Sequence, residues 1–290
     1  MSDTHAPTTP VPTVLSIAGS DPSGGAGIQA DIKAISARGA YAMAAITALT
    51  AQNTQGVSGV HTIPPDFVAQ QIDAVFADIR VDAVKIGMIA NAPIAQAVAA
   101  SLARQRDAGW TGAVVLDPVM VAKGGAPLLD PDAVAAVTGA LVPLATVATP
   151  NLPELARLVG APAPAADRAA MRTQAQALLA AGVGAVLAKG GHLDGGESPD
   201  LMLSPAGETW LEGPRVQTAN THGTGCTLAA ALAAELAHDR PLAEAAAAAK
   251  AYVAGAIAAA DGLQIGHGHG PTHHFHALWP APAAGRGDRR

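Results

Sequence analysis

Asn220-Thr-His-Gly-Thr-Gly-Cys226 leads directly into an alanine-rich run from Thr227 to Ala237. Two glycines just before a helix start free the backbone to turn its N–H groups toward one point, where the helix dipole also favours negative charge. The stretch therefore predicts an anion-binding turn at the start of a helix. A plain helix cap, in which Thr221 or Thr224 satisfies the first N–H groups, is the alternative that this stretch alone leaves open.

Cys226 closes this stretch and is the only cysteine in the 290 residues. A single cysteine excludes an intramolecular disulfide. A thiol at a helix N-terminus has its pKa lowered, because the dipole stabilises the thiolate. The position therefore predicts that Cys226 serves as a base or an anion-stabilising group.

The composition excludes several classes of protein. Half of the residues are apolar but only 3% are aromatic, which suits helices packed on a sheet better than an aromatic-rich β-sandwich. The net charge is -6, and the only basic run is Arg286 to Arg290, so nucleic acid is not an expected partner. The start of the chain lacks a secretory pattern, and no apolar run reaches the roughly 18 residues of a membrane span. We expect a cytoplasmic enzyme.

Short β-branched runs alternate with longer helical patterns, which is typical of βα units and a mainly parallel sheet. A hairpin is expected from two further runs joined by Pro205-Ala-Gly207. No internal linker or repeat is present, so we expect a single domain over residues 13–279, with disordered tails at 1–12 and 280–290. The predicted strands are Thr13 to Ala18, Ala44 to Leu49, Val57 to Ile63, Val81 to Gly87, Ala113 to Asp117, Thr146 to Thr149 and Ala185 to Lys189, and the hairpin pairs Leu201 to Ser204 with Thr209 to Gly213.

Polar residues follow the predicted strands at the edge where open parallel sheets bind ligands. The loop Gly19 to Gly27 has four glycines but no P-loop lysine, and it predicts a lid or a substrate wall. Asp31, one turn into the next helix, predicts either a salt bridge or a substrate contact. Gln52 follows the second strand, and its amide complements a ring nitrogen beside an amino group. Met88, after the fourth strand, would by itself be a core residue.

Two acids and a lysine lie at the ends of later strands. Asp117 ends the fifth strand and Glu154 lies in the first turn of the helix after the sixth. Together they suit Mg²⁺, which takes only one or two carboxylates, although an acid in a first helical turn also complements the dipole. Lys189 ends the seventh strand and is costly to bury unpaired, so a phosphate would pair it. An anion hole, a lysine, two acids and a base are the parts of a phosphoryl-transfer site.

Seven motifs in combination carry a resemblance to a known family. They are Gly19 to Asp31, Thr47 to Asn53, Lys85 to Met88, Asp117 to Met120, Thr149 to Glu154, Lys189 to His192 and Asn220 to Cys226. Over roughly Val14 to Trp279 the chain resembles the hydroxymethylpyrimidine/phosphomethylpyrimidine kinases of thiamine biosynthesis, in the ribokinase-like superfamily. The resemblance implies an α/β three-layer sandwich, with a mostly parallel central sheet and helices on both faces. It also implies ATP- and Mg²⁺-dependent phosphorylation of 4-amino-5-hydroxymethyl-2-methylpyrimidine, then of its monophosphate, by a homodimer.

The resemblance also implies roles for single residues. Gln52 would bind the pyrimidine, in a pocket lined by Asp31, Met88 and Gly19. Cys226 would be the base, where many ribokinase-like enzymes carry an aspartate. The N–H groups of Gly223, Thr224 and Gly225 would steady the transferring phosphoryl group. The remaining implied residues are Asp117 and Glu154 for Mg²⁺ and its waters, and Lys189, Asn151 and Thr221 for the nucleotide.

Three alternatives stay open from the sequence. A pyridoxal or pyridoxine kinase of the same fold would phosphorylate a hydroxymethyl group on a pyridine ring, and a non-catalytic module would keep the pyrimidine pocket without turnover. The segment Gly266 to His276 holds five histidines, which allows either a metal site or docking of the C-terminal segment onto the domain. The sequence leaves open whether a monovalent cation assists.

Overall fold

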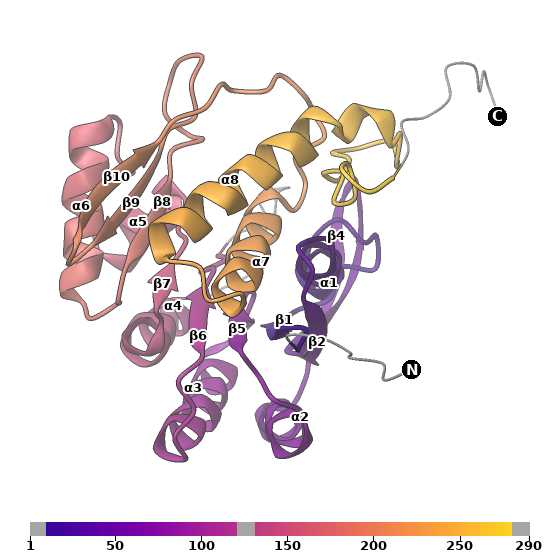
Figure 1. The fold of residues 1–290 in the computed structure, drawn as a ribbon, viewed down its shortest axis with the longest axis vertical. Coiled ribbons are helices and arrows are strands. Elements are labelled where there is room, and N and C mark those ends of the chain that lie inside the picture. Colours follow the sequence, from indigo (N-terminus) through magenta and orange to yellow (C-terminus); the bar gives the residue numbers. More distant parts are fainter. Residues whose placement is uncertain (1–9, 121–130, 280–290) are drawn as a thin grey trace, which may run out of the picture.

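A computed structural model describes residues 10–120 and 131–279, and its central element is an eight-stranded sheet (Figure 1). The strand order is β10-β9-β8-β7-β6-β5-β1-β2. All neighbours from β8 to β2 are parallel, and β9 and β10 form an antiparallel hairpin at one edge. The strands are β1 (Thr13–Ala18), β2 (Tyr41–Ile46), β5 (Ala83–Ile86), β6 (Ala113–Leu116), β7 (Val147–Ala148), β8 (Val186–Lys189), β9 (Asp200–Ser204) and β10 (Gly207–Leu211).

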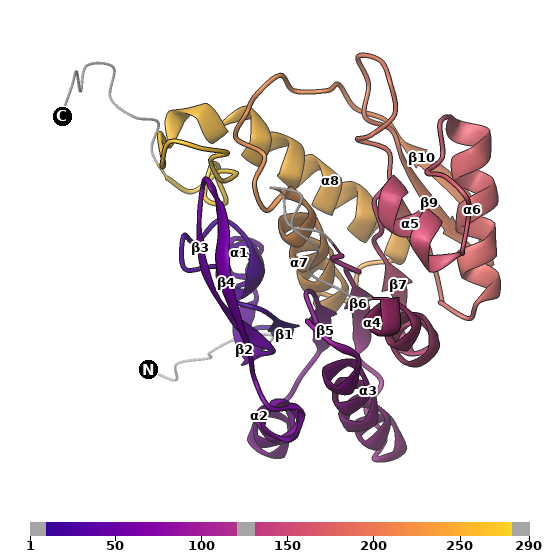
Figure 2. The same cartoon turned by 180° about the vertical axis from the view of Figure 1, so that it is seen from behind.

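Helices cover both faces of this sheet, as Figures 1 and 2 show from opposite sides. One apolar cluster joins the sheet to the first group of helices, and a second cluster joins the opposite face to the other group. The three-layer arrangement with a mostly parallel sheet is therefore confirmed. The first group is α2 (Pro65–Asp78), α3 (Ala92–Asp107), α4 (Pro131–Ala136), α5 (Leu152–Leu158) and α6 (Arg168–Ala180), and the second is α1 (Gly27–Ala37), α7 (Thr224–Ala237) and α8 (Leu242–Ala258). A π-helical turn (Val137–Leu141) and two 3₁₀ turns (Val142–Leu144 and Ala260–Gly262) complete the helical segments.

Helix α7 is buried nearly all round, which explains its alanine content. It packs on the sheet and between α1 and α8. A helix that is enclosed on most sides needs small apolar side chains, because neighbouring backbones approach it closely. The alanine-rich run thus fixes the N-terminus of α7 against the carboxyl ends of the parallel strands.

A second, two-stranded antiparallel sheet stands beside the main one and was not expected. It pairs β3 (Ala48–Asn53) with β4 (Gly56–Thr62). The predicted strand Ala44 to Leu49 is therefore wrong, because the chain leaves the main sheet at Thr47. The Thr47 hydroxyl there donates to the carbonyl oxygen of Met88 at 2.7 Å. Gln52 accordingly lies within β3, not in a loop after the second strand.

The predicted tails fall mostly outside the described residues, which exclude 1–9 and 280–290. Residues 11 and 12, assigned to the N-terminal tail, make hydrogen bonds to the domain: the Val11 carbonyl accepts from Arg80, and the Pro12 carbonyl accepts from the Tyr41 N–H. The single domain over 13–279 stays a prediction. Where the structure describes the chain, its helices are all too short or too polar to span a membrane.

Candidate active site

A cavity of about 1330 Å³ lies along the carboxyl ends of the parallel strands and the N-terminus of α7. It reaches from β3 to the β9–β10 hairpin, because Gln52 and Trp210 both line it. This is the edge where an open parallel sheet binds ligands. All but one of the predicted site residues line this cavity, namely Gly19, Gln52, Met88, Asp117, Asn151, Glu154, Lys189, Thr221, Gly223, Thr224, Gly225 and Cys226.

The N-terminus of α7 requires glycine at its first position. Gly223 is the N-cap residue in the left-handed region at φ 76°, and a Cβ there would lie 1.8 Å from the carbonyl oxygen of Gly25. Gly223 has no side chain to cap the helix, and the Thr224 hydroxyl donates to the Thr221 carbonyl oxygen. A cap by the Thr224 side chain is thus not observed, and the residues at the start of α7 line the cavity.

Gly225 brings this helix end against two charged side chains. A Cβ on Gly225 would lie 3.1 Å from Nζ of Lys189 and 3.7 Å from Oδ2 of Asp117. The helix N-terminus, a lysine and a carboxylate therefore meet at one point. A phosphate placed there would have both N–H donors and a cation within reach.

Burial raises the pKa of the Cys226 thiol to about 11, so the predicted lowering is wrong for the free protein. The Lys85 ammonium group and the Gly27 N–H act in the opposite direction, because both stabilise a thiolate. The helix dipole alone does not overcome the cost of placing a charge in this partly enclosed position. Cys226 is therefore a thiol at neutral pH before ligands bind.

Lys189 joins the two predicted metal ligands. Its Nζ lies 3.0 Å from Oδ1 of Asp117 and 3.9 Å from Oε2 of Glu154. Burial lowers the pKa of Lys189, but the two carboxylates outweigh burial and raise it. Lys189 is thus a cation that Asp117 and Glu154 already pair in the ligand-free protein, so its burial does not by itself require a phosphate.

Asp117 and Glu154 have the chemistry of a Mg²⁺ site. Oδ2 of Asp117 is buried and has no hydrogen-bond partner among the described residues. Glu154 is held by a capping box with Asn151, and burial raises the pKa of its carboxyl group to about 7. No third acid, histidine or cysteine joins these two within the described residues. Two carboxylates fit Mg²⁺, which keeps several waters, better than they fit a fully protein-bound ion.

Asp31 does not line the cavity, and of the two alternatives for this residue the structure shows the salt bridge. Its Oδ2 accepts from Nζ of Lys85 at 2.8 Å and from the Ser16 hydroxyl at 2.6 Å. Asp31 and Lys85 are both fully buried. Lys85, the partner of Asp31, does line the cavity. A lysine inside the apolar strand β5 was the available signal, because such a lysine needs a buried partner.

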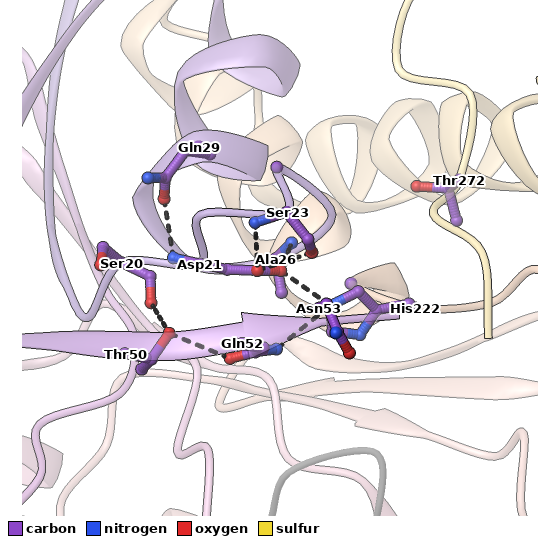
Figure 3. Close-up of polar contacts among 12 residues, drawn as sticks. Ser20, Asp21, Ser23, Ala26, Gln29, Thr50, Gln52, Asn53, His222 and Thr272 are labelled. Carbon is purple, nitrogen blue, oxygen red and sulfur yellow. Dashed lines mark hydrogen bonds and ion pairs between the residues drawn. The ribbon is translucent and has the colours of Figure 1, made fainter. Parts of the chain in front are cut away.

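Asp21 and His222 are two cavity residues that sequence reasoning did not single out (Figure 3). Nε2 of His222 lies 2.8 Å from Oδ2 of Asp21 and 3.3 Å from Nε2 of Gln52. The pair connects the glycine-rich loop, the start of α7 and strand β3. No local pattern marks this connection, since Asp21 and His222 are 201 positions apart.

The histidine-rich segment 266–276 docks onto α7 and α8. His274 is buried, with Nε2 3.1 Å from the Thr227 hydroxyl, and its carbonyl oxygen accepts from the Tyr252 hydroxyl. The His222 N–H also donates to the Gly270 carbonyl oxygen. These contacts favour the docking alternative over a metal site.

The far end of the cavity is lined by α8 and the β9–β10 hairpin. An ion pair between Lys250 and Asp200 at 2.8 Å lies there, beside apolar residues of α8. The cavity thus has one end with an amide and a histidine, a charged centre, and one largely apolar end. The apolar residues are Ala247, Ala251, Val253, Ala254 and Ile257.

Comparison with known proteins shows that this chain is similar to small-molecule kinases. The hydroxymethylpyrimidine/phosphomethylpyrimidine kinase of Escherichia coli (strain K12) is 53% identical over 265 residues, covering 91% of this chain and 98% of that protein. A solved phosphomethylpyrimidine kinase from Clostridium difficile 630 is 39% identical with a TM-score of 0.74, covering 84% of this chain and 99% of that chain. A pyridoxal kinase from Staphylococcus aureus, solved with AMP-PCP and pyridoxal, is 33% identical with a TM-score of 0.83, covering 93% and 96%.

The sequence profile described as phosphomethylpyrimidine kinase matches residues 21–273, from the glycine-rich loop to the docked C-terminal segment. The match therefore includes every residue that lines the charged centre of the cavity. On these grounds the chain belongs to the phosphomethylpyrimidine kinase family.

Proposed function

We propose that this protein transfers the γ-phosphoryl group of ATP to the hydroxyl group of 4-amino-5-hydroxymethyl-2-methylpyrimidine, and then phosphorylates the monophosphate, for thiamine biosynthesis. The observation that carries the proposal is that the N-terminus of α7 lies beside Lys189, Asp117 and Glu154, in a cavity that Gln52 also lines. Phosphoryl transfer needs positioned donors and charge neutralisation more than covalent chemistry. The high identity to kinases of this name supports the substrate.

Gln52, Met88 and Gly19 form the proposed pyrimidine end. A Cβ on Gly19 would lie 3.0 Å from Sδ of Met88, so the loop packs closely against this side chain at a position that favours glycine. The Gln52 amide faces the cavity from β3 and offers one acceptor beside one donor. An aminopyrimidine edge matches that pair.

Asp117 and Glu154 would hold Mg²⁺ directly or through its waters, and Mg²⁺ would neutralise charge on the phosphates. Lys189 would contact the transferring group, while the N–H groups at Gly223, Thr224 and Gly225 would stabilise charge on its oxygens. Asn151 and Thr221 line the same part of the cavity and would contact the nucleotide. Adenine would lie toward the apolar end along α8.

Cys226 would accept the hydroxyl proton as transfer occurs. The hydroxymethyl oxygen attacks the γ-phosphorus, the bond to the ADP oxygen breaks, and the hydroxyl proton passes to the Cys226 thiolate. Burial keeps the thiol protonated in the free protein, so Cys226 must first release its proton to solvent through the cavity that it lines. The Lys85 ammonium group and the Gly27 N–H favour that loss.

A coupled assay of ADP release tests the proposal against its alternatives. The aminopyrimidine alcohol, its monophosphate and pyridoxine are offered side by side with Mg-ATP. We expect turnover of the first two substrates and at least tenfold lower kcat/KM with pyridoxine, since a hydrogen-bonding site rejects a ring that leaves its amide unpaired. Preference for pyridoxine would favour the pyridoxal kinase function, which the Staphylococcus aureus structure makes the second candidate. Tight binding without ADP release would identify a non-catalytic module.

Gln52→Leu tests the substrate end separately. Leucine keeps much of the volume but removes both polar atoms of the amide. We expect kcat/KM for the aminopyrimidine to fall at least tenfold, because two hydrogen bonds to the ring edge are lost. Unchanged kinetics would remove Gln52 from the substrate site.

A further inference from the structure

Asp21 is a carboxylate whose oxygens are fully occupied by donors (Figure 3). Oδ1 accepts from the N–H and the hydroxyl of Ser23, at 2.9 and 2.6 Å. Oδ2 accepts from the Ala26 N–H at 2.8 Å and faces Nε2 of His222 at the same distance. Burial works against ionisation, but these hydrogen bonds outweigh it and lower the pKa of Asp21 to about 2. Asp21 is therefore an anion with no lone pair left for a substrate.

An anion at this distance determines which ring nitrogen of His222 carries a proton. If Nε2 lacked its hydrogen, its lone pair would face the Asp21 carboxylate at 2.8 Å, which is repulsive. Nε2 therefore carries hydrogen and donates it to Asp21, in the neutral and in the charged ring alike. The ring has little freedom to turn, since a Cβ on Gly25 would lie 2.4 Å from its Cδ2 atom.

The proton on His222 in turn restricts the amide of Gln52. The Nε2 atoms of Gln52 and His222 lie 3.3 Å apart, and both bear hydrogen, so neither accepts from the other. Turning the amide by 180° about its last bond places Oε1 toward His222, where it shares the single Nε2 hydrogen with Asp21 in a three-centre bond. The same turn places the NH₂ group toward the Thr50 hydroxyl, which lies 3.3 Å from the other amide atom. Thr50 already donates to the Ser20 carbonyl oxygen at 2.9 Å, so its oxygen is able to accept.

We propose that Asp21 and His222 are positioning residues that lock the Gln52 amide with its oxygen toward His222, and thereby select a 4-amino over a 4-oxo pyrimidine and set the direction of the ring. This inference rests on the proposed role of Gln52. With that orientation the 4-amino group donates to Oε1, and ring nitrogen N3 accepts from the NH₂ group. A 4-oxo ring presents the reverse pattern, an N3–H donor and an oxygen acceptor, and it is rejected.

The locked amide also directs the reacting group. In the substrate the 5-hydroxymethyl group is attached next to the carbon that carries the 4-amino group, on the side away from N3. With the amino group on the His222 side of Gln52, the hydroxymethyl group points toward the segment that follows His222, which is Gly223 to Cys226. The same hydrogen-bond chain that selects the ring thus aims its hydroxyl group at the start of α7.

His222→Phe tests the proposal, because phenylalanine keeps a flat ring but has no N–H. The quantity measured is the ratio of kcat/KM for the aminopyrimidine alcohol to that for its 4-oxo analogue. Both substrates are assayed on the same sample, so the ratio does not depend on the folded fraction. We expect the ratio to fall at least about tenfold, because the freed amide is able to turn and match either ring. A ratio within twofold of that of the unmodified protein would overturn the proposal.

Three further variants make the test specific. His222→Gln places an amide N–H near the position of Nε2 and should keep most of the ratio; a loss as large as that of His222→Phe contradicts the proposal. Asp21→Asn removes the anion that fixes the His222 proton and should lower the ratio as well. His267→Phe, a change at an exposed histidine outside the cavity, should leave the ratio unchanged. The Gln52→Leu variant separates the two claims. If it leaves the aminopyrimidine reaction intact, the proposed role of Gln52 itself is wrong. If Gln52→Leu impairs the reaction but His222→Phe keeps the ratio, the role of Gln52 stands and the proposed locking by His222 is wrong.

Discussion

Cys226 is the residue whose role depends most on its surroundings. It lies in the first turn of α7 and accepts from the Gly27 N–H, but burial raises its pKa to about 11. If its thiolate takes the hydroxyl proton, Cys226→Ala should lower kcat by well over tenfold while the dissociation constant for nucleotide changes little. Steady-state kinetics with nucleotide titration would measure both. Activity within about tenfold, roughly 1.4 kcal/mol of barrier, would show that the thiol is not the base.

Lys85 and Asp31 form the most deeply buried ion pair of the site, with both side chains fully enclosed. Lys85→Met removes one partner and leaves the Asp31 carboxylate uncompensated. We expect a loss of about 3 to 5 kcal/mol in the free energy of unfolding, measured by denaturant titration. Adding Asp31→Asn should recover part of the loss, since no buried charge then remains. Equal stability of the single and double variants would mean that the Asp31 carboxylate is not left uncompensated when Lys85 is removed.

Glu154 should make the free energy of unfolding of the metal-free protein depend on pH. Burial raises the pKa of its carboxyl group from 4.5 to about 7, so the folded state binds the proton more tightly than the unfolded chain. The contribution of Glu154 to stability therefore falls as pH rises from 4.5 to about 7, by about 3 kcal/mol at most. Denaturant titrations in EDTA at pH 5 and pH 8 should show this decline. Glu154→Gln, which does not titrate, should lose less stability over the same interval; an identical decline would assign it to other groups.

At the scale of elements, the turn into α7 and the glycine-rich loop hold each other in place. Gly223 needs both a left-handed conformation and contact with the Gly25 backbone. Gly223→Ala should therefore shift the start of α7 and reduce kcat/KM by at least tenfold, with a stability cost of about 1 to 3 kcal/mol. Gly139→Ala is a suitable control, because a Cβ there meets nothing within 4 Å among the described residues. Equal effects of the two changes on kcat/KM would contradict this role of Gly223.

The elements that the sequence predicted well are those whose local pattern and tertiary role agree. Strand β1 coincides with the predicted run Thr13 to Ala18, because a strand buried on both faces of a parallel sheet is mostly apolar and is easily seen in the sequence. Strand β3 was mispredicted because it lies outside the main sheet and pairs with β4. Its residues therefore alternate between exposed and half-buried, and they do not form the apolar run of a central strand. The Asp31–Lys85 and Asp21–His222 pairs join residues 54 and 201 positions apart, and only the fold brings them together.

At the scale of the whole molecule, the two-stranded β3–β4 sheet leaves much of its surface exposed, and contact with a second copy of the chain would cover it. Strand β4 is exposed along most of its length, and an isolated two-stranded sheet is marginally stable in water. The open edge of such a sheet is also a template for pairing with another chain. Leu49 on β3 is 44% exposed, on the opposite face of that strand from Gln52. We therefore propose the homodimer that the family resemblance implies, with β3 and β4 at its interface.

Leu49→Asp tests this assembly without touching the cavity. A charge buried between two copies lacks a partner, so we expect the sedimentation coefficient to shift from that of a dimer to that of a monomer at micromolar concentration. Because the dimer would steady β3, and Gln52 lies on β3, KM for the aminopyrimidine should rise in the monomer more than kcat falls. Leu278→Asp, at an exposed leucine in the C-terminal segment, should leave both mass and KM unchanged. If the unmodified protein is already a monomer and Leu49→Asp has the same KM, the dimer proposal is wrong. Strand β3 is then held by this chain alone, through the main-chain bonds that Ala48 and Thr54 accept from Ser20 and His269.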